Sequence, residues 1–395
     1  MSDRSSSVPV GSPWRRRGRW LLLPLVFLFI NLFGAAPNDG DMVLQIMDEG
    51  GFVEVGEKAL RLALVEHDFR NPFWADPYWN YGANNPRLGV FIVGAVGQFA
   101  GLITPDKEKK KFVMRLVMSL LSTAVVALLF ALTVRLTASR PAAYAAAALL
   151  LWHPAFRLVA RSMLTEIPLL LFCLLTLHGA WWIKTDRQRP QRATPWILTG
   201  LAAGCAISTK LFAVGLLPLL LLLIGRRIWL LGRAAVYPAL LLLASIVVVF
   251  VLSNPLLWTD PVYGVEMMTV LHVRSNDGYV TWPEWGRMKP LFFQTFDFFS
   301  WRFDAARIGI PPPESFPWWR AAPGFALTVA GLAVRNAGRD KWMILTTFVG
   351  FLAIYAYVAG IMSADWYRLK LALLSAVGAI ALCSYLVCRL VPAKE

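Results

Sequence analysis

Charged residues are scarce in this sequence. Asp, Glu, Lys and Arg make up 16% of the 395 residues, whereas hydrophobic residues make up 57%. A soluble domain needs more polar surface than this composition supplies, so the scarcity of charge excludes one. The hydrophobic residues occur in blocks of roughly 15 to 22, about the length of a helix that crosses a hydrocarbon core of ~30 Å. We therefore predict an all-α polytopic membrane protein, because a helix satisfies its own backbone polar groups.

Cysteine and histidine are also few, with four residues of each type. The cysteines lie inside hydrophobic blocks, and their spacing indicates neither a disulfide framework nor a metal site. The histidines show no spacing that is typical of metal ligands. We therefore predict no metal and no cofactor. The four cysteines are Cys173, Cys205, Cys383 and Cys388.

Acidic residues are outnumbered, with 24 against 39 basic residues and a net charge of +15. The basic residues stand in short clusters between hydrophobic blocks, where the positive-inside rule explains them, so we predict no nucleic-acid binding. The first cluster, "RRRGRW", precedes a hydrophobic run from Trp20 to Ala36. This order predicts an uncleaved first helix and a cytoplasmic N-terminus. A cleaved signal peptide is the alternative, since small residues end the run in "FGAAP".

The segment "LGVFIVGAVGQFAGL", from Leu88 to Leu102, decides the topology. It is short for a span, and counting it as one would place later basic clusters outside. If the segment is instead an amphipathic or half-buried helix on the outer surface, nearly all of the basic clusters lie in the cytoplasm. We predict this second arrangement, with about ten spanning helices in a bundle. The predicted spans are the first helix and residues 112–134, 141–156, 166–183, 194–209, 211–225, 234–254, 321–335, 341–360 and 368–390.

This topology divides the chain into four regions. They are a cytoplasmic basic tail (1–19), a transmembrane module (20–254) that contains an external loop (38–111), an external Trp- and Pro-rich region (255–320), and C-terminal transmembrane helices (321–395). Several polar segments then share the external face. They are Asp48 with Glu49, "NNPRLG", "RSMLTE", Lys210, "NPLLWTDP", "LHVRSND" and "ADWYR".

The order of these motifs resembles the GT-C membrane glycosyltransferases. The stretches that carry the resemblance are the Asp-Glu pair of the first loop, "RSMLTEIPLLLF", "GCAISTK" and "NPLLWTDP". The most similar branch is the bacterial group related to protein O-mannosyltransferases and lipid A aminoarabinose transferases, which are phospholipid carrier-dependent. The resemblance implies a GT-C bundle in a bacterial inner membrane, a polyprenyl-phosphate-linked sugar as donor, and transfer with inversion at the periplasmic side. The implied acceptor is a lipid, a protein or a glycan.

The resemblance also assigns expected roles to individual residues. The catalytic acid of the family's first loop corresponds to Asp48, with Glu49 beside it, and a second family acid corresponds to Glu166. The family's usual "[HK]-P-P-L" is here "NPRL", in which Arg87 replaces the second proline. This departure leaves Arg87 to supply the positive charge that a phosphate needs.

The chemistry of sugar transfer explains why acids and cations are needed together. A carboxylate takes the proton of the incoming hydroxyl, and cations stabilise the leaving phosphate. On this basis we predict Asp48 and Glu166 as catalytic residues. The predicted substrate-binding residues are Glu49, Arg87, Arg161, Lys210, His272, Arg274 and Arg368.

Five of these residues also have a structural interpretation. Asp48 and Glu49 are favourable at the start of a helix near Phe52, and Glu166 is favourable in the first turn of another. Arg161 is suited to snorkelling toward the membrane surface, and Lys210 to a turn between two spans. Glu54 and Glu57 are expected on the solvated face of the helix near Phe52.

Two other classes of protein remain open from the sequence. A secondary transporter or lipid flippase would carry polar residues near the middle of its spans and helix breaks in paired positions. The sequence instead concentrates its charges at one face. A non-catalytic scaffold with the same fold is the third possibility, and loss of activity on Asp48→Asn would argue against it.

Overall fold

Every regular element of the described chain is a helix, as predicted. The computed structural model describes residues 26, 49–74, 87–137, 140–152, 156, 160, 162–186, 192–266 and 268. The predicted first helix and the three predicted C-terminal spans lie outside these residues. The first elements along the chain are α4 (Glu49–Leu64), η1 (Pro72–Trp74), α5 (Leu88–Ile103), α6 (Lys107–Thr137) and α7 (Arg140–Trp152). After them come α9 (Glu166–Thr185), α10 (Ala193–Thr209), η2 (Leu211–Leu216), α11 (Leu217–Leu231), η3 (Gly232–Ala235), α12 (Val236–Leu252), α13 (Leu256–Thr259) and α14 (Pro261–Glu266).

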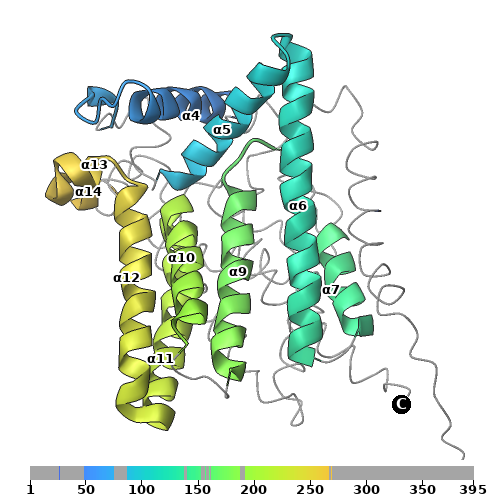
Figure 1. The fold of residues 1–395 in the computed structure, drawn as a ribbon. Helices are drawn as coiled ribbons and strands as arrows, with labels where there is room; N and C mark the ends of the chain where they lie inside the picture. Colours follow the sequence, from blue (N-terminus) through green and yellow to red (C-terminus); the bar gives the residue numbers. More distant parts are fainter. Residues whose placement is uncertain are drawn as a thin grey trace, which may run out of the picture.

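The long helices form a row, in which some packed pairs are neighbours in the sequence and others are not. α7 packs on α6, α6 on α9, α9 on α10, and α10 on α12. Figure 1 shows these helices upright, with α4 and α5 lying across one end of the row. Within the described residues, three helical stretches are long and apolar enough to cross a membrane, namely Lys107–Arg135, Glu166–Thr185 and Ala213–Leu252. The chain is therefore an integral membrane protein.

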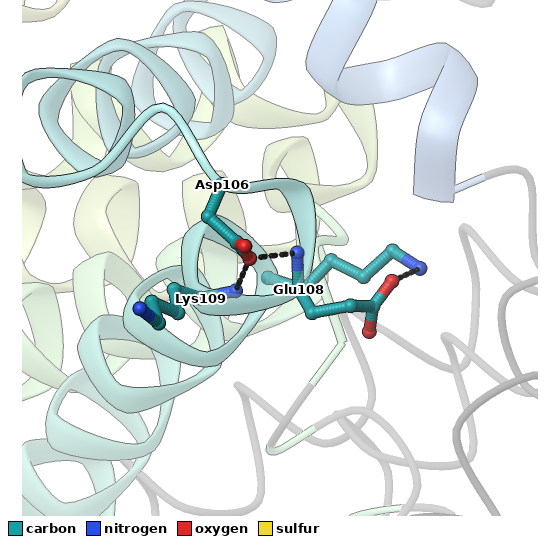
Figure 2. Close-up of polar contacts among 4 residues, drawn as sticks. Asp106, Glu108 and Lys109 are labelled. Atoms are coloured by element: carbon teal, nitrogen blue, oxygen red, sulfur yellow. Dashed lines mark hydrogen bonds and ion pairs between the residues drawn. The ribbon is translucent and has the colours of Figure 1, made fainter.

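The helix α6 is longer than its hydrophobic block predicts. The sequence predicts a span over residues 112–134, whereas α6 begins at Lys107 and ends at Thr137. Its 31 residues extend for about 46 Å at 1.5 Å each, which exceeds a hydrocarbon core of ~30 Å. The polar first turn is made possible by Asp106, whose Oδ1 accepts hydrogen bonds from the backbone N–H groups of Glu108 and Lys109, both at 3.0 Å (Figure 2). This is an N-cap, which hydropathy alone does not reveal.

The helices α4 and α5 form a pair that caps one end of the bundle. They cross where Gly56 meets Gly94, since a Cβ built on Gly94 would lie 2.2 Å from the carbonyl carbon of Gly56. Small residues at such a crossing let two backbones approach closely. An ion pair of 2.8 Å between Lys110 and Glu57 ties the start of α6 to α4. The Glu57 side chain is 30% exposed, so the helix face that is expected to be solvated is partly covered here by the start of α6.

The opposite end of the bundle is rich in basic residues. Here α6 and α9 end, and α10 and α12 begin. The described charged residues at this end are Arg135, Arg140, Lys184, Asp186, Arg192, Arg226, Arg227 and Arg233. Two further contacts hold this end together: Arg227 Nη2 donates a 2.7 Å hydrogen bond to the carbonyl of Asp186, and Arg135 contacts His178. This distribution of charge is the one that the positive-inside rule predicts for a cytoplasmic end.

We predict that Gly94→Ala destabilises the protein by about 1–3 kcal/mol, because the added methyl group overlaps the backbone of α4. Gly101→Ala is the matched control in the same helix, since a Cβ there meets only the Lys110 side chain, at 3.8 Å. The control should be neutral or slightly stabilising, as alanine favours a helix over glycine. Thermal unfolding in detergent measures both variants. Equal midpoints for the two variants would show that the α4–α5 crossing is not tightly packed.

Candidate functional site

A buried ion pair joins two helices at the capped end of the bundle. Glu166 is the first residue of α9, and Lys210 directly follows the last residue of α10. Because α9 and α10 are antiparallel neighbours, these two positions meet, and Lys210 Nζ donates a hydrogen bond to Glu166 Oε1. The Glu166 side chain is only 2% exposed and the Lys210 side chain only 3%. Glu166 and Lys210 are 44 positions apart in the sequence. The fold therefore brings together two of the predicted site residues.

Local sequence explains why both charges lie at this place. Lys210 has extended backbone angles (φ −153°, ψ 135°), so α10 ends there and the chain turns into η2. Glu166 stands in the first turn of α9, where a negative charge is favoured by the helix dipole. A buried charge is costly unless it is paired, so each side chain depends on the other.

Arg87 is the third predicted site residue in the described chain, and it is also buried, at 2% exposed. Its Nη2 donates to the carbonyl of Trp74 at 3.1 Å, and its guanidinium lies 5.7 Å from the Trp74 ring centre. Burial lowers the pKa of Arg87 to about 9. Since this value is still above neutral pH, the guanidinium is a cation held among aromatic rings.

Asn254 connects Arg87 to the end of α12. The Oδ1 atom of Asn254 accepts a 2.9 Å hydrogen bond from the backbone N–H of Arg87, and its Nδ2 donates to the carbonyl of Phe250. Asn254 is fully buried, so both ends of its amide find partners within the protein. A further contact joins the loop after α4 to α13, since the rings of Phe69 and Trp258 lie 4.8 Å apart.

Gly89 lets the start of α5 reach the ion pair. A Cβ built on Gly89 would lie 2.8 Å from Thr165 Cγ2 and 2.9 Å from Thr209 Cγ2. These threonines directly precede Glu166 and Lys210, so the start of α5 packs against both chain positions. The helices α5, α9, α10 and α12 therefore meet at this place. We call the four residues gathered here the junction: Arg87, Glu166, Lys210 and Asn254. Two nearby hydroxyls, those of Thr165 and Ser208, are buried with no hydrogen-bond partner among the described residues.

Of the remaining predicted site residues, the structure describes only Glu49. Glu49 is the first residue of α4. Asp48, Arg161, His272, Arg274 and Arg368 lie outside the described residues, so their roles stay predictions. In the described ranges, no three His, Cys, Asp or Glu side chains lie close enough to hold a metal ion.

Asn254 is the residue of the junction that the sequence alone does not predict as a site residue. Its signal is the motif "NPLLWTDP", in which an Asn follows a long hydrophobic run. Such an Asn is ordinarily a residue that ends a helix, and only the meeting of α5 with α12 shows its second partner.

Comparison with known proteins identifies the class of fold. ArnT from Cupriavidus metallidurans, in a crystal structure bound to undecaprenyl phosphate, matches with a TM-score of 0.55 and 16% sequence identity. The match covers 96% of this chain and 61% of the ArnT chain, so this chain spans less than two thirds of the length of ArnT. The fold is that of the GT-C membrane glycosyltransferases, which confirms the predicted fold class.

The sequence also matches a known family over part of its length. The family described as dolichyl-phosphate-mannose-protein mannosyltransferase matches residues 95–258, a segment that contains Glu166, Lys210 and Asn254. No curated protein matches the chain. The family and the fold together confirm the resemblance to GT-C glycosyltransferases.

We predict that Lys210→Met destabilises the protein by about 3–5 kcal/mol, because it leaves the Glu166 carboxylate buried without its ammonium partner. The double variant Glu166→Gln/Lys210→Met should regain most of this loss, since no charge is then left uncompensated. Lys110→Met is the control, and it should cost about 0–1 kcal/mol, because its pair with Glu57 is roughly 30% exposed. Thermal unfolding in detergent ranks the three variants, and an equal loss for Lys210→Met and Lys110→Met contradicts the buried pair.

We predict that Asn254→Ala increases hydrogen exchange at the start of α5, because the N–H of Arg87 loses its acceptor. Ser253→Ala is the control, because it leaves the Asn254 oxygen in place and should keep the protection. Hydrogen-exchange mass spectrometry of peptides that begin near Arg87 makes the comparison. Unchanged exchange in Asn254→Ala would show that the hydrogen bond does not hold α5.

Proposed function

We propose that this chain is an inverting glycosyltransferase that moves a sugar from a polyprenyl-phosphate donor to a lipid, protein or glycan acceptor. The observation that carries the proposal is the junction, in which two cations and a carboxylate are buried at one end of a GT-C bundle. The fold is shared with ArnT, whose structure holds undecaprenyl phosphate. A phosphate on a membrane-bound carrier is the ligand that buried cations at the end of spanning helices suit best.

We place the reaction on the periplasmic face of a bacterial inner membrane. The support is the charge distribution, since the described charged residues at the end opposite the junction are seven basic residues and one acidic residue, whereas basic and acidic residues are mixed at the capped end. This orientation gives a cytoplasmic N-terminus. The isoprenoid tail of the donor then lies among the spanning helices, while its phosphate reaches the junction at the membrane boundary.

The chemistry divides between acids and cations. The acceptor hydroxyl attacks the anomeric carbon, its proton passes to the Asp48 carboxylate, and the bond between the anomeric carbon and the phosphate oxygen breaks. Lys210 and Arg87, with Arg161, bind the leaving polyprenyl phosphate and stabilise its growing charge. Glu166 holds the Lys210 ammonium in position and orients the substrates. Glu49, His272, Arg274 and Arg368 complete the proposed substrate contacts.

The proposal is tested by incubating the purified protein with a panel of polyprenyl-phosphate sugars and candidate acceptors. Acceptor-dependent release of polyprenyl phosphate is expected for one donor. The variant Glu166→Gln/Lys210→Met should fold and yet lose at least tenfold in turnover, because the phosphate loses the Lys210 ammonium, whose charge-assisted contact is typically worth about 1.5–3 kcal/mol. Lys110→Met should retain turnover.

Two outcomes would overturn this function. If no donor is consumed while a lipid or solute crosses proteoliposomes, the protein is a transporter. If the double variant turns over as fast as the wild type, the junction does not bind the donor.

A further inference from the structure

At the end of the bundle opposite the junction, uncharged side chains hold an arginine in place. Arg135 lies in the last turn of α6, and its Nη1 is 2.8 Å from Nδ1 of His178 on α9. A guanidinium has only donors, so Nδ1 accepts this hydrogen bond, and Nε2–H donates to the carbonyl of Leu128 at 2.9 Å. These two hydrogen bonds fix His178 as a neutral imidazole with its proton on Nε2. His178 therefore orients the cation without changing its charge.

An aromatic ring holds the same guanidinium from another side. The central carbon of the Arg135 guanidinium lies 5.2 Å from the ring centre of Trp181, a cation–π contact. Trp181 follows His178 by three residues, so both side chains project from one face of α9. Arg135 is itself exposed. His178 and Trp181 thus hold the Arg135 guanidinium in one orientation and leave part of it exposed.

The position of Arg135 along the helix indicates what surrounds it. The hydrophobic block of α6, residues 112–134, ends immediately before Arg135, so Arg135 stands where the hydrophobic part of the helix ends. This is the level of the lipid headgroups, whose phosphates bind basic side chains. Trp182 and Trp229 are exposed at the same end, as is typical of an aromatic belt.

The two ends of α6 differ in the acidic residues around their cations. At the capped end, acidic and basic residues are mixed in the first turns of α6 (Figure 2), where Lys110 pairs with Glu57 and Lys111 pairs with Glu108, each at 2.8 Å. At the other end, none of the described acidic side chains forms an ion pair with Arg135. Asp186 is the one acidic residue among the described charged side chains there. The counter-charge for Arg135 is therefore expected from outside the described chain.

We propose that Arg135, oriented by His178 and Trp181, binds the phosphate of an anionic phospholipid headgroup in the leaflet opposite the junction. The guanidinium fork donates two hydrogen bonds to phosphate oxygens, and the indole shields the pair from water. The acyl chains lie along the outer surface of α6 and α9. This binding does not depend on the proposed sugar transfer.

The test is native mass spectrometry of the purified full chain with dioleoyl phosphatidylglycerol and with dioleoyl phosphatidylcholine, which differ only in the headgroup. The wild type should bind phosphatidylglycerol about fivefold more tightly, and Arg135→Gln should remove this preference. Lys109→Gln is the matched control, because it removes an exposed positive charge from the opposite end of α6 (Figure 2). It should keep the preference.

A second measurement needs only the wild type. Photoreactive phosphatidylglycerol should crosslink to peptides that contain Arg135 or Trp181. The proposal fails if the wild type binds both lipids equally, if Arg135→Gln and Lys109→Gln lose the preference to the same extent, or if the crosslinks fall only at the Lys107 end of α6.

Discussion

The buried ion pair of Glu166 and Lys210 is the constraint on which the capped end of the bundle depends. Each charge is nearly inaccessible to water, so neither side chain is tolerable without the other. The pair fixes the start of α9 against the end of α10, and these positions support the start of α5 through Thr165 and Thr209. If the pair served only to stabilise the fold, apolar side chains of similar volume would do so as well. The retention of two charges at this place is the physical reason to look for a charged ligand there.

The junction also joins segments that are far apart in the sequence. Asn254, at the end of α12, holds the backbone of Arg87, which in turn binds the carbonyl of Trp74. The helices α4 and α5 are therefore fastened to the bundle by specific hydrogen bonds as well as by packing. A donor phosphate at the junction would lie beneath this cap, shielded from water, where electrostatic interactions are strongest.

The sequence predicts the described spans closely, because hydrophobic blocks end at polar residues. The spans predicted at 166–183 and 194–209 correspond to α9 (Glu166–Thr185) and α10 (Ala193–Thr209). The start of α6 was set instead by the Asp106 cap, which no hydrophobic pattern reveals. Glu166 and Lys210 were predictable, since ionisable residues at the ends of spans are conspicuous. The role of Asn254 and the pairing of Glu57 were not, because they depend on which helices meet in space.

The central claim is that the cations of the junction bind the phosphate of a polyprenyl carrier. The most direct test compares the binding of undecaprenyl phosphate with that of undecaprenol, which lacks the phosphate, to the wild type and to Glu166→Gln/Lys210→Met. We expect the phosphate group to tighten binding to the wild type by a factor at least ten times larger than the factor for the double variant. An equal gain from the phosphate in both proteins would contradict phosphate binding at the junction.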